Sequence, residues 1–343
     1  MSAEPAVTLP AADGIARSSG IPRAASAGRA VPTDGAPKTC IACGARPRPR
    51  WRLRGGFRIV QCPRCLLAWW AWPPFDPGAF YDENYFQSGA APKGYDDYAA
   101  LEVGLARTAR ARLKRIARQF RVSSFEFRER RPAELETRSS KLETPRLLEL
   151  GCGTGVFLAE ARRAGWEVEG VEVSAYAAER ARARGLPVRT AALEGLAFAP
   201  TVYDCVALWD VIEHLRDPAG VLAAAARALR ADGVLALSTG DVTSLCARLS
   251  GPGWHLFNLP EHLFFFSPAA LERLLRSAGL QIAAVEREVY WAPAAYLLER
   301  LRKSQGPVGR VADRAARLLA PCIAELTIPA TVGDVLGVYA TKT

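Results

Sequence analysis

Three glycines follow a short apolar run and could form a turn that approaches a ligand closely: Gly151, Gly153 and Gly155. The run, 147–150, includes Glu149, and a second apolar stretch, 167–173, carries Glu172 near its end. Glycine allows sharp turns and close backbone approach, and an acid about 20 residues further on can hold a ribose hydroxyl pair. The spacing E-x-G-x-G-x-G is not the G-x-G-x-x-G dinucleotide pattern, and no Gly-Lys-Ser/Thr follows as in a phosphate loop. It therefore indicates a strand, a glycine turn and a helix that bind a ribose-containing ligand.

Four cysteines form two C-x-x-C pairs: Cys40, Cys43, Cys62 and Cys65. The 18 residues between the pairs lie within the spacing of a four-cysteine structural zinc site. The segment between them predicts a short hairpin, with strands at 51–53 and 57–60 joined through Gly55 and Gly56. Four thiolate ligands leave no open coordination position, so the expected zinc is structural. We predict a zinc ribbon over residues 39–75.

The chain has three histidines, and two of them stand where a general base would be useful. His214 follows the apolar run 203–209, next to Glu213, and His262 lies among aromatic residues. An imidazole titrates near neutrality, which suits proton transfer. His262, His214 and Glu213 are therefore the catalytic candidates. The alternatives are that His214 caps the helix at 217–218 or bonds a backbone carbonyl, that His262 is a structural loop residue, that Glu213 forms a surface ion pair and that the aromatic residues fill the core.

Alternating strand and helix patterns from residue 146 onward predict the element that positions these groups. The strand candidates are 146–150, 167–173, 187–190, 203–209, 233–239, 281–290 and 334–342. The helix candidates are 156–164, 175–184, 218–230 and 268–278. Such alternation predicts an α/β fold with a doubly wound, mostly parallel seven-stranded sheet. Ligands bind beyond the carboxyl ends of such strands, where the glycine turn, Glu172 and the segment around His214 would meet.

Changes in composition divide the chain into six parts. These are a disordered tail at 1–38, the zinc ribbon at 39–75, an aromatic connector with an amphipathic helix (101–120) and a loop at 76–144, the ligand-binding domain at 145–291, a helical insertion at 292–330 and a final strand at 331–343. Within the insertion, residues 309–325 place arginines and apolar residues on opposite sides. This segment is either a membrane-surface element or a packing helix.

The charge distribution bears on possible partners. The 343 residues carry a net charge of +10, and seven arginines without an acid lie between Cys40 and Cys65. This is either a solvated face or a surface for an anionic partner. We find no secretory signal and no apolar stretch long enough to span a bilayer. Eight cysteines in such a chain do not indicate disulfides, and we expect a cytoplasmic protein.

From Arg146 to about Leu280 the chain resembles the class I S-adenosylmethionine-dependent methyltransferases. The segments WDVIEHLRDP (209–218) and PEHLFFFSP (260–268) resemble the branch that methylates quinones, sugars and other small molecules. A zinc ribbon before such a domain is also a recurrent arrangement among these enzymes. The resemblance implies that Glu149 and the glycine turn hold the methionine end of S-adenosylmethionine and that Glu172 takes both ribose hydroxyls. It also implies that the rest of the cofactor pocket is lined by Leu193, Trp209 and Asp210.

The pattern departs from the family after the third predicted strand, where many relatives have an acid for the adenine amino group. Here Ala191 and Ala192 stand in that region, so the backbone or Glu194 would read adenine. We expect O-methylation of a small-molecule acceptor: a sugar, a quinone-like phenol or a lipid-linked intermediate. The alternatives are an RNA methyltransferase whose basic ribbon grips phosphates, and a non-catalytic interaction protein. The oligomeric state is left open.

Overall fold

The computed structural model describes residues 35–53, 56–72, 101–119, 144–296 and 326–342. The expected tail before residue 35, the connector at 76–100, the loop at 121–143 and the segment 309–325 lie outside these ranges. Among the described helices, none combines the length and the apolar character needed to cross a membrane.

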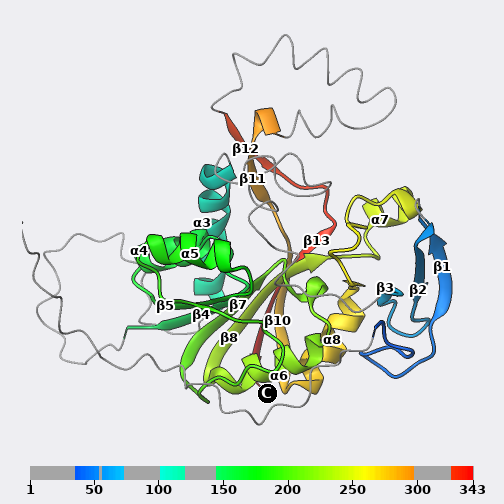
Figure 1. Ribbon diagram of the computed structural model, residues 1–343, viewed down its shortest axis with the longest axis horizontal. Helices are drawn as coiled ribbons and strands as arrows, with labels where there is room; N and C mark the ends of the chain where they lie inside the picture. Colours follow the sequence, from blue (N-terminus) through cyan, green and yellow to red (C-terminus); the bar gives the residue numbers. More distant parts are fainter. Residues whose placement is uncertain (1–34, 54–55, 73–100, 120–143, 297–325, 343) are drawn as a thin grey trace, which may run out of the picture.

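A seven-stranded sheet forms the centre of the fold (Figure 1). Its strands are β4 (Arg146–Leu150), β5 (Glu167–Glu172), β6 (Val188–Thr190), β7 (Tyr203–Trp209), β8 (Leu229–Gly240), β10 (Leu280–Arg287) and β13 (Val335–Lys342). Their order is β10-β13-β8-β7-β4-β5-β6. The sheet is mixed rather than parallel throughout, because β13 runs antiparallel to both β10 and β8. Strand β10 forms the edge of the sheet, and β13 lies between it and β8.

Helices cover both faces of this sheet (Figure 1). On one face lie α3 (Glu102–Gln119), α4 (Val156–Arg163) and α5 (Ala175–Ala183), and on the other α6 (Pro218–Ala228) and α8 (Pro268–Ser277). Side chains of a strand alternate between its faces. In β7, Cys205 and Ala207 pack into the core on the α3 side, whereas Val206 and Leu208 pack into the core on the α6 side. A strand buried on both faces accounts for the continuous apolar runs in the sequence.

A smaller sheet joins the N-terminal segment to the later part of the chain. It consists of β1 (Arg48–Arg52), β2 (Arg58–Gln61), β3 (Ala68–Trp70) and the two-residue β9 (Phe264–Phe265). The predicted hairpin is therefore present, at slightly shifted bounds, and it gains a third strand that the sequence pattern did not indicate. The fourth strand is contributed by a segment almost 200 residues downstream.

Two further strands, β11 (Tyr290–Pro293) and β12 (Thr327–Ala330), pair with each other beside α3 (Figure 1). The insertion expected to be helical over 292–330 thus begins and ends in strand. A Cβ atom at Gly104 of α3 would lie 2.1 Å from the carbonyl oxygen of Trp291, so a glycine is needed where the helix meets β11. The remaining short elements are η3 (Ile212–His214), α7 (Leu245–Ser250) and η4 (Gly251–Gly253).

Candidate active site

The glycine turn between β4 and α4 has the backbone that its composition predicts. Gly151, Gly153 and Gly155 have φ values of 74°, 51° and 79°, which L-residues rarely adopt. A Cβ at Gly155 would lie 2.5 Å from Cδ1 of Leu186. Glu172 at the end of β5 closes the turn, because its carboxylate accepts the N–H of Gly153 and of Ser174, each at 2.8 Å. Burial raises the pKa of Glu172, and the two backbone donors counteract that rise.

Three buried polar atoms along this edge have no hydrogen-bond partner among the described residues: Glu149 Oε2, Thr154 Oγ1 and Trp209 Nε1. Burial raises the pKa of Glu149 well above its usual value. Buried polar groups are nearly always hydrogen-bonded, so unpaired ones call for an explanation. Their position around the glycine turn fits a polar ligand that completes the site, and the residues present are compatible with the methionine end of S-adenosylmethionine.

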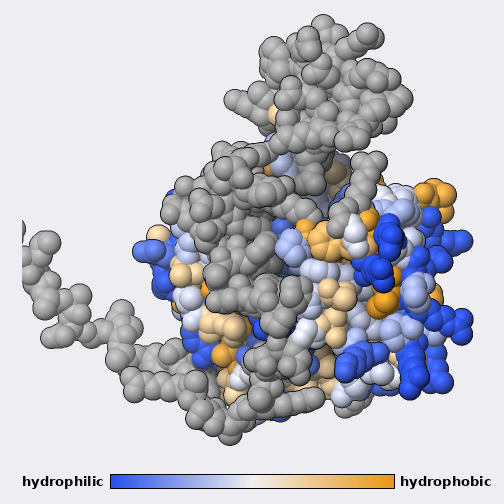
Figure 2. Space-filling view, turned by 45° about the vertical axis from the view of Figure 1, so that its right-hand side comes forward, coloured by the Kyte–Doolittle hydropathy of each residue, from blue (hydrophilic) through white to orange (hydrophobic). Residues whose placement is uncertain are grey.

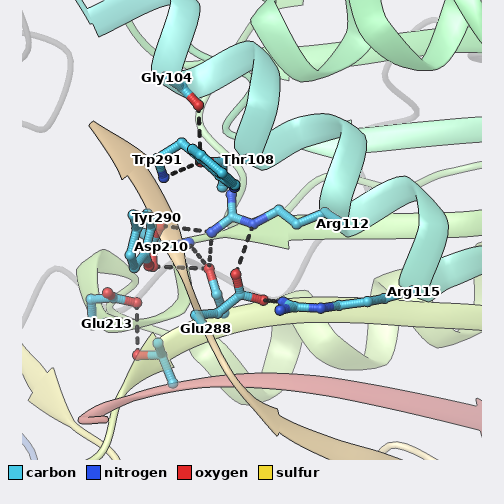
Figure 3. A network of polar contacts seen from close by, with 11 residues as sticks. Gly104, Thr108, Arg112, Arg115, Asp210, Glu213, Glu288, Tyr290 and Trp291 are labelled. Atoms are coloured by element: carbon cyan, nitrogen blue, oxygen red, sulfur yellow. Dashed lines mark hydrogen bonds and ion pairs between the residues drawn. The ribbon is translucent and has the colours of Figure 1, made fainter. Parts of the chain in front are cut away.

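Asp210, directly after β7, is the centre of a polar network (Figure 3). It has a positive φ of 56°. One carboxylate oxygen accepts the hydroxyls of Ser238 and Tyr290, each at 2.8 Å, and the other lies 3.3 Å from the guanidinium of Arg112. Arg112 also stacks over Trp209, with 4.3 Å between its Cζ and the ring centroid. Helix α3, which precedes the glycine turn in the sequence, thus holds Trp209 and Asp210, two of the residues predicted to line the cofactor pocket.

A buried carboxylate, Glu288, completes the network on the side away from the pocket. Its oxygens lie 3.4 Å from Arg112 Nε and 3.0 Å from Arg115 Nη1. The sequence motifs did not point to Arg112, Glu288 or Tyr290 as site residues. A signal existed for the first, because Arg112 stands four residues before Ile116 and therefore on the apolar face of its helix. An arginine on such a face needs a buried acid as partner.

Two other predicted groups lie beside this pocket. Leu193 is buried, and the N–H of Ala191 donates to the carbonyl of Glu172 at 2.9 Å, which ties the segment after β6 to the end of β5. The carboxylate of Glu194 accepts the N–H of Arg216 at 3.0 Å. That contact ties Glu194 to the segment that follows η3.

The catalytic candidates lie together. The rings of His214 and His262 pack edge to face with 4.7 Å between their centroids, and ligand atoms of both lie within 4.8 Å of the Glu213 carboxylate. Glu213 is buried, so its interpretation as a surface ion pair is wrong. The helix cap interpretation of His214 is also wrong, because Asp217 caps α6 by accepting the N–H of Gly220 at 3.0 Å. The other interpretation, a bond to the backbone, agrees with the hydrogen bond between His214 and the backbone of Glu261.

Burial shifts the pKa values of His214 and Glu213 in the direction that favours their neutral forms. Burial and the neighbouring His262 lower the pKa of His214 well below its usual value. Burial, together with the nearby Asp210, raises the pKa of Glu213 to about 8. Thr239 Oγ1 donates to the Glu213 carboxyl at 2.9 Å. Nδ1 of His262 lies 2.9 Å from the carbonyl oxygen of Leu256.

Comparison with known proteins identifies the fold that carries this geometry. A family model described as a methyltransferase domain matches residues 108–285, more than half of the chain. The chain belongs to this methyltransferase family. With 31% identity over 191 residues, it resembles the ubiquinone biosynthesis O-methyltransferase of Xanthomonas euvesicatoria pv. vesicatoria, covering 49% of this chain and 78% of that protein. The enzyme of that name from Xylella fastidiosa is 32% identical over 174 residues, with 46% and 71% covered.

Two solved structures are also similar. One is a possible histamine N-methyltransferase from Thermotoga maritima, with a TM-score of 0.39, 24% identity and coverage of 58% of this chain and 82% of that chain. The other is magnesium protoporphyrin IX methyltransferase from Synechocystis, with bound SAH, a TM-score of 0.43, 15% identity and coverage of 72% and 87%. The family assignment rests on the sequence matches, and it makes this chain an S-adenosylmethionine-dependent methyltransferase.

The methyltransferase also gathers its four predicted zinc ligands at one point. The Sγ atoms of Cys40 and Cys65 are 3.4 Å apart, as are those of Cys43 and Cys62, and the Cys43–Cys65 separation is 3.9 Å. Tetrahedral zinc with Zn–S bonds of about 2.3 Å places its sulfurs about 3.8 Å from each other. Gly44 turns the first pair with φ 70°, and its N–H donates to the Cys40 carbonyl at 2.8 Å. The donor set and its spacing fit zinc.

Proposed function

We propose that this methyltransferase transfers a methyl group to a hydroxyl of a small-molecule acceptor, with His262 as the general base. The acceptor classes are a sugar, a quinone-like phenol or a lipid-linked intermediate. The observation that carries the proposal is the pair of half-buried imidazoles that pack edge to face, with ring nitrogens within 4.8 Å of the Glu213 carboxylate. The names of the relatives, ubiquinone biosynthesis O-methyltransferases, support a small hydroxylated acceptor.

The cofactor would be held by the edge of the sheet that contains the glycine turn. Glu149 and Thr154 offer unpaired polar atoms for the methionine end, and Glu172 faces the turn with a carboxylate suited to ribose hydroxyls. Leu193, Trp209 and Asp210 would line the rest of the pocket. When bound, S-adenosylmethionine supplies a sulfonium methyl that is already activated. The protein's remaining tasks are alignment of the acceptor and removal of its proton.

The hydrogen bond of His262 selects a tautomer suited to a base. A carbonyl oxygen only accepts, so the contact with Leu256 requires that Nδ1 carries the proton. In the neutral ring, Nε2 is then the basic nitrogen. His214 stays neutral because its pKa is lowered by burial, so it does not repel the charge that His262 gains. The proton of the acceptor hydroxyl would pass to Nε2 as the methyl–oxygen bond forms.

We further propose that Cys40, Cys43, Cys62 and Cys65 bind one structural zinc ion. Four thiolates fill its coordination sphere, which leaves no position for an acceptor or water. The module between residues 35 and 72 is too small to be stable through apolar burial alone. Zinc binding would therefore contribute directly to its folding.

Calorimetric titration with S-adenosylmethionine tests the cofactor site, with Gly153→Arg as the control that fills the turn. One-site binding that the substitution abolishes is expected, and a folded wild-type protein that does not bind would refute the proposal. Catechols and hydroxylated benzoates then serve as acceptor probes, with the methylated product detected by mass spectrometry. His262→Gln should lower turnover about 100-fold or more. His255→Gln is the matched control, since His255 is half exposed and lies 3.6 Å from Asp334.

One observation favours RNA as a second candidate acceptor. The arginines of β1 are exposed, and the side of the molecule that carries this hairpin is largely hydrophilic (Figure 2). Such a surface can neutralise phosphates. RNA binding that weakens steeply with salt would support this candidate, and a lack of binding to a structured RNA at low salt would exclude it.

A further inference from the structure

The four-cysteine module (residues 35–72) and the segment just after His262 contribute strands to the same sheet. Strand β3 begins three residues after Cys65 and pairs antiparallel with β9. Its Ala68 is opposite Phe265 and its Trp69 is opposite Phe264. Strand β9 in turn begins two residues after His262. A strand of two residues cannot fix its own position, so its alignment depends on the partner strand.

The side chain of Trp70 reaches from the module to the backbone of His262. The indole N–H of Trp70 donates to the backbone carbonyl of His262 at 3.0 Å, and Trp70 is 5% exposed. The N–H of His262 donates to the carbonyl of Asn258 at 2.8 Å. The next peptide is tied to the other catalytic candidate, because the N–H of Leu263 donates to the carbonyl of Glu213 at 2.8 Å. The main chain of His262 is therefore held on both sides.

Two more contacts connect the module with the same loop. The hydroxyl of Ser267 donates to the carbonyl of Cys65 and also caps α8 by accepting the N–H of Ala270 at 3.1 Å. Trp72 packs edge to face on Phe264, with ring centroids 5.0 Å apart. The module thus contacts both the backbone and the side chains of the segment that follows His262.

We infer that the four-cysteine module is a positioning element for the histidine pair and that Trp70 is the residue through which it acts. This inference rests on the proposed function of His262. The metal would fold the module, the module would align β3, and Trp70 would then set the direction of the His262 peptide. Displacement of a base by about 1 Å can cost two orders of magnitude in rate. Loss of the metal should therefore disturb His214 and His262, although the metal site does not touch either side chain.

Three tryptophans within four residues, Trp69, Trp70 and Trp72, provide matched variants. Trp70→Phe removes the donor to His262. Trp69→Phe removes a donor that bonds within the module, to the carbonyl of Pro37 at 3.1 Å. Trp72→Phe removes an indole N–H that has no partner among the described residues. All three replace the same side chain in a buried position, so a general loss of packing would appear in all of them.

The readout is the NMR spectrum of the imidazole C–H groups, which needs no acceptor. The chain has only three histidines, and half-exposed His255 serves as the internal reference. We expect Trp70→Phe to shift the His262 and His214 resonances and to leave His255 in place. Trp69→Phe should preserve all three, and so should Trp72→Phe, because a phenylalanine ring can keep the edge-to-face contact with Phe264. Removal of zinc from the wild-type protein with a chelator should reproduce the shifts of His262 and His214.

Once an acceptor has been identified, turnover can be measured as well. Trp70→Phe should lower it about tenfold or more and leave the affinity for S-adenosylmethionine unchanged. If the imidazole resonances of His262 and His214 keep their wild-type positions in Trp70→Phe, the inference is overturned. Equal shifts in all three variants would also overturn it, since they would indicate packing alone. Failure of cofactor binding by calorimetry would instead refute the proposed function, and the NMR result would still be readable.

Discussion

Arg112→Met is expected to destabilise this methyltransferase by about 3 kcal/mol, because it removes one of the two arginine partners of a buried carboxylate, Glu288. The Arg112 side chain is 9% exposed, and that of Glu288 is fully buried. Breaking such a buried pair costs about 3 to 5 kcal/mol. The lower end applies here for two reasons. Arg115 remains 3.0 Å from Glu288, and the second partner, Asp210, is 40% exposed and can be solvated.

Urea unfolding followed by tryptophan fluorescence measures this loss, and the melting temperature should fall by roughly 6 to 12 °C. Arg110→Met is the matched control on the same helix. Arg110 pairs with Glu160 at 3.2 Å but is 54% exposed, so its loss should cost less than about 1 kcal/mol. In a double-mutant cycle, Glu288→Gln should recover about 1 kcal/mol or more in the Arg112→Met background. Equal effects of the two arginine substitutions, or strict additivity with Glu288→Gln, would refute the reasoning.

Three further predictions concern the cofactor, the metal and pH. Glu172→Gln should weaken S-adenosylmethionine binding about 10- to 100-fold by calorimetry, because an amide oxygen cannot replace a carboxylate that accepts two backbone N–H groups at 2.8 Å. Metal analysis should find one zinc per chain, and Cys62→Ser should remove it and lower the melting temperature; metal-free wild-type protein with an unchanged melting curve would contradict this. The folded-state pKa of Glu213, about 8, exceeds the unfolded value of about 4.3. The folded protein therefore binds the extra proton, and its unfolding free energy should fall as pH rises from about 5 through about 8; Glu213→Gln should flatten that profile.

Features encoded within a few residues were predictable from the sequence. The glycine turn needs only Gly151, Gly153 and Gly155 and the apolar runs beside them, and its contact with Glu172 follows from the strand spacing. Helix α3 was expected at 101–120 and spans Glu102–Gln119, since its apolar positions recur at helical spacing. One interpretation of the aromatic residues around His262 was that they fill the core, and Phe264, Phe265 and Phe266 are all buried.

Features that depend on distant pairing were not predictable. Strand β9 has two residues, too few for a periodic signal, and exists because β3 lies beside it. The reversed direction of β13 depends on where the chain re-enters the sheet. Arg112 and Glu288 are 176 residues apart, and nothing local to either identifies the other. Each of these features is a property of the folded chain rather than of a sequence window.

The conformation of Asp210 explains why the cofactor site needs elements from outside the core motif. A non-glycine residue with φ of 56° carries a conformational cost of about 1 kcal/mol or more, although aspartate adopts this region more readily than most residues. Hydrogen bonds from Arg112, Ser238 and Tyr290 offset that cost. They come from α3, β8 and β11, so the end of β7 takes its shape only when all three have docked. Helix α3 is therefore part of the site, which agrees with a family match that begins at residue 108, inside that helix.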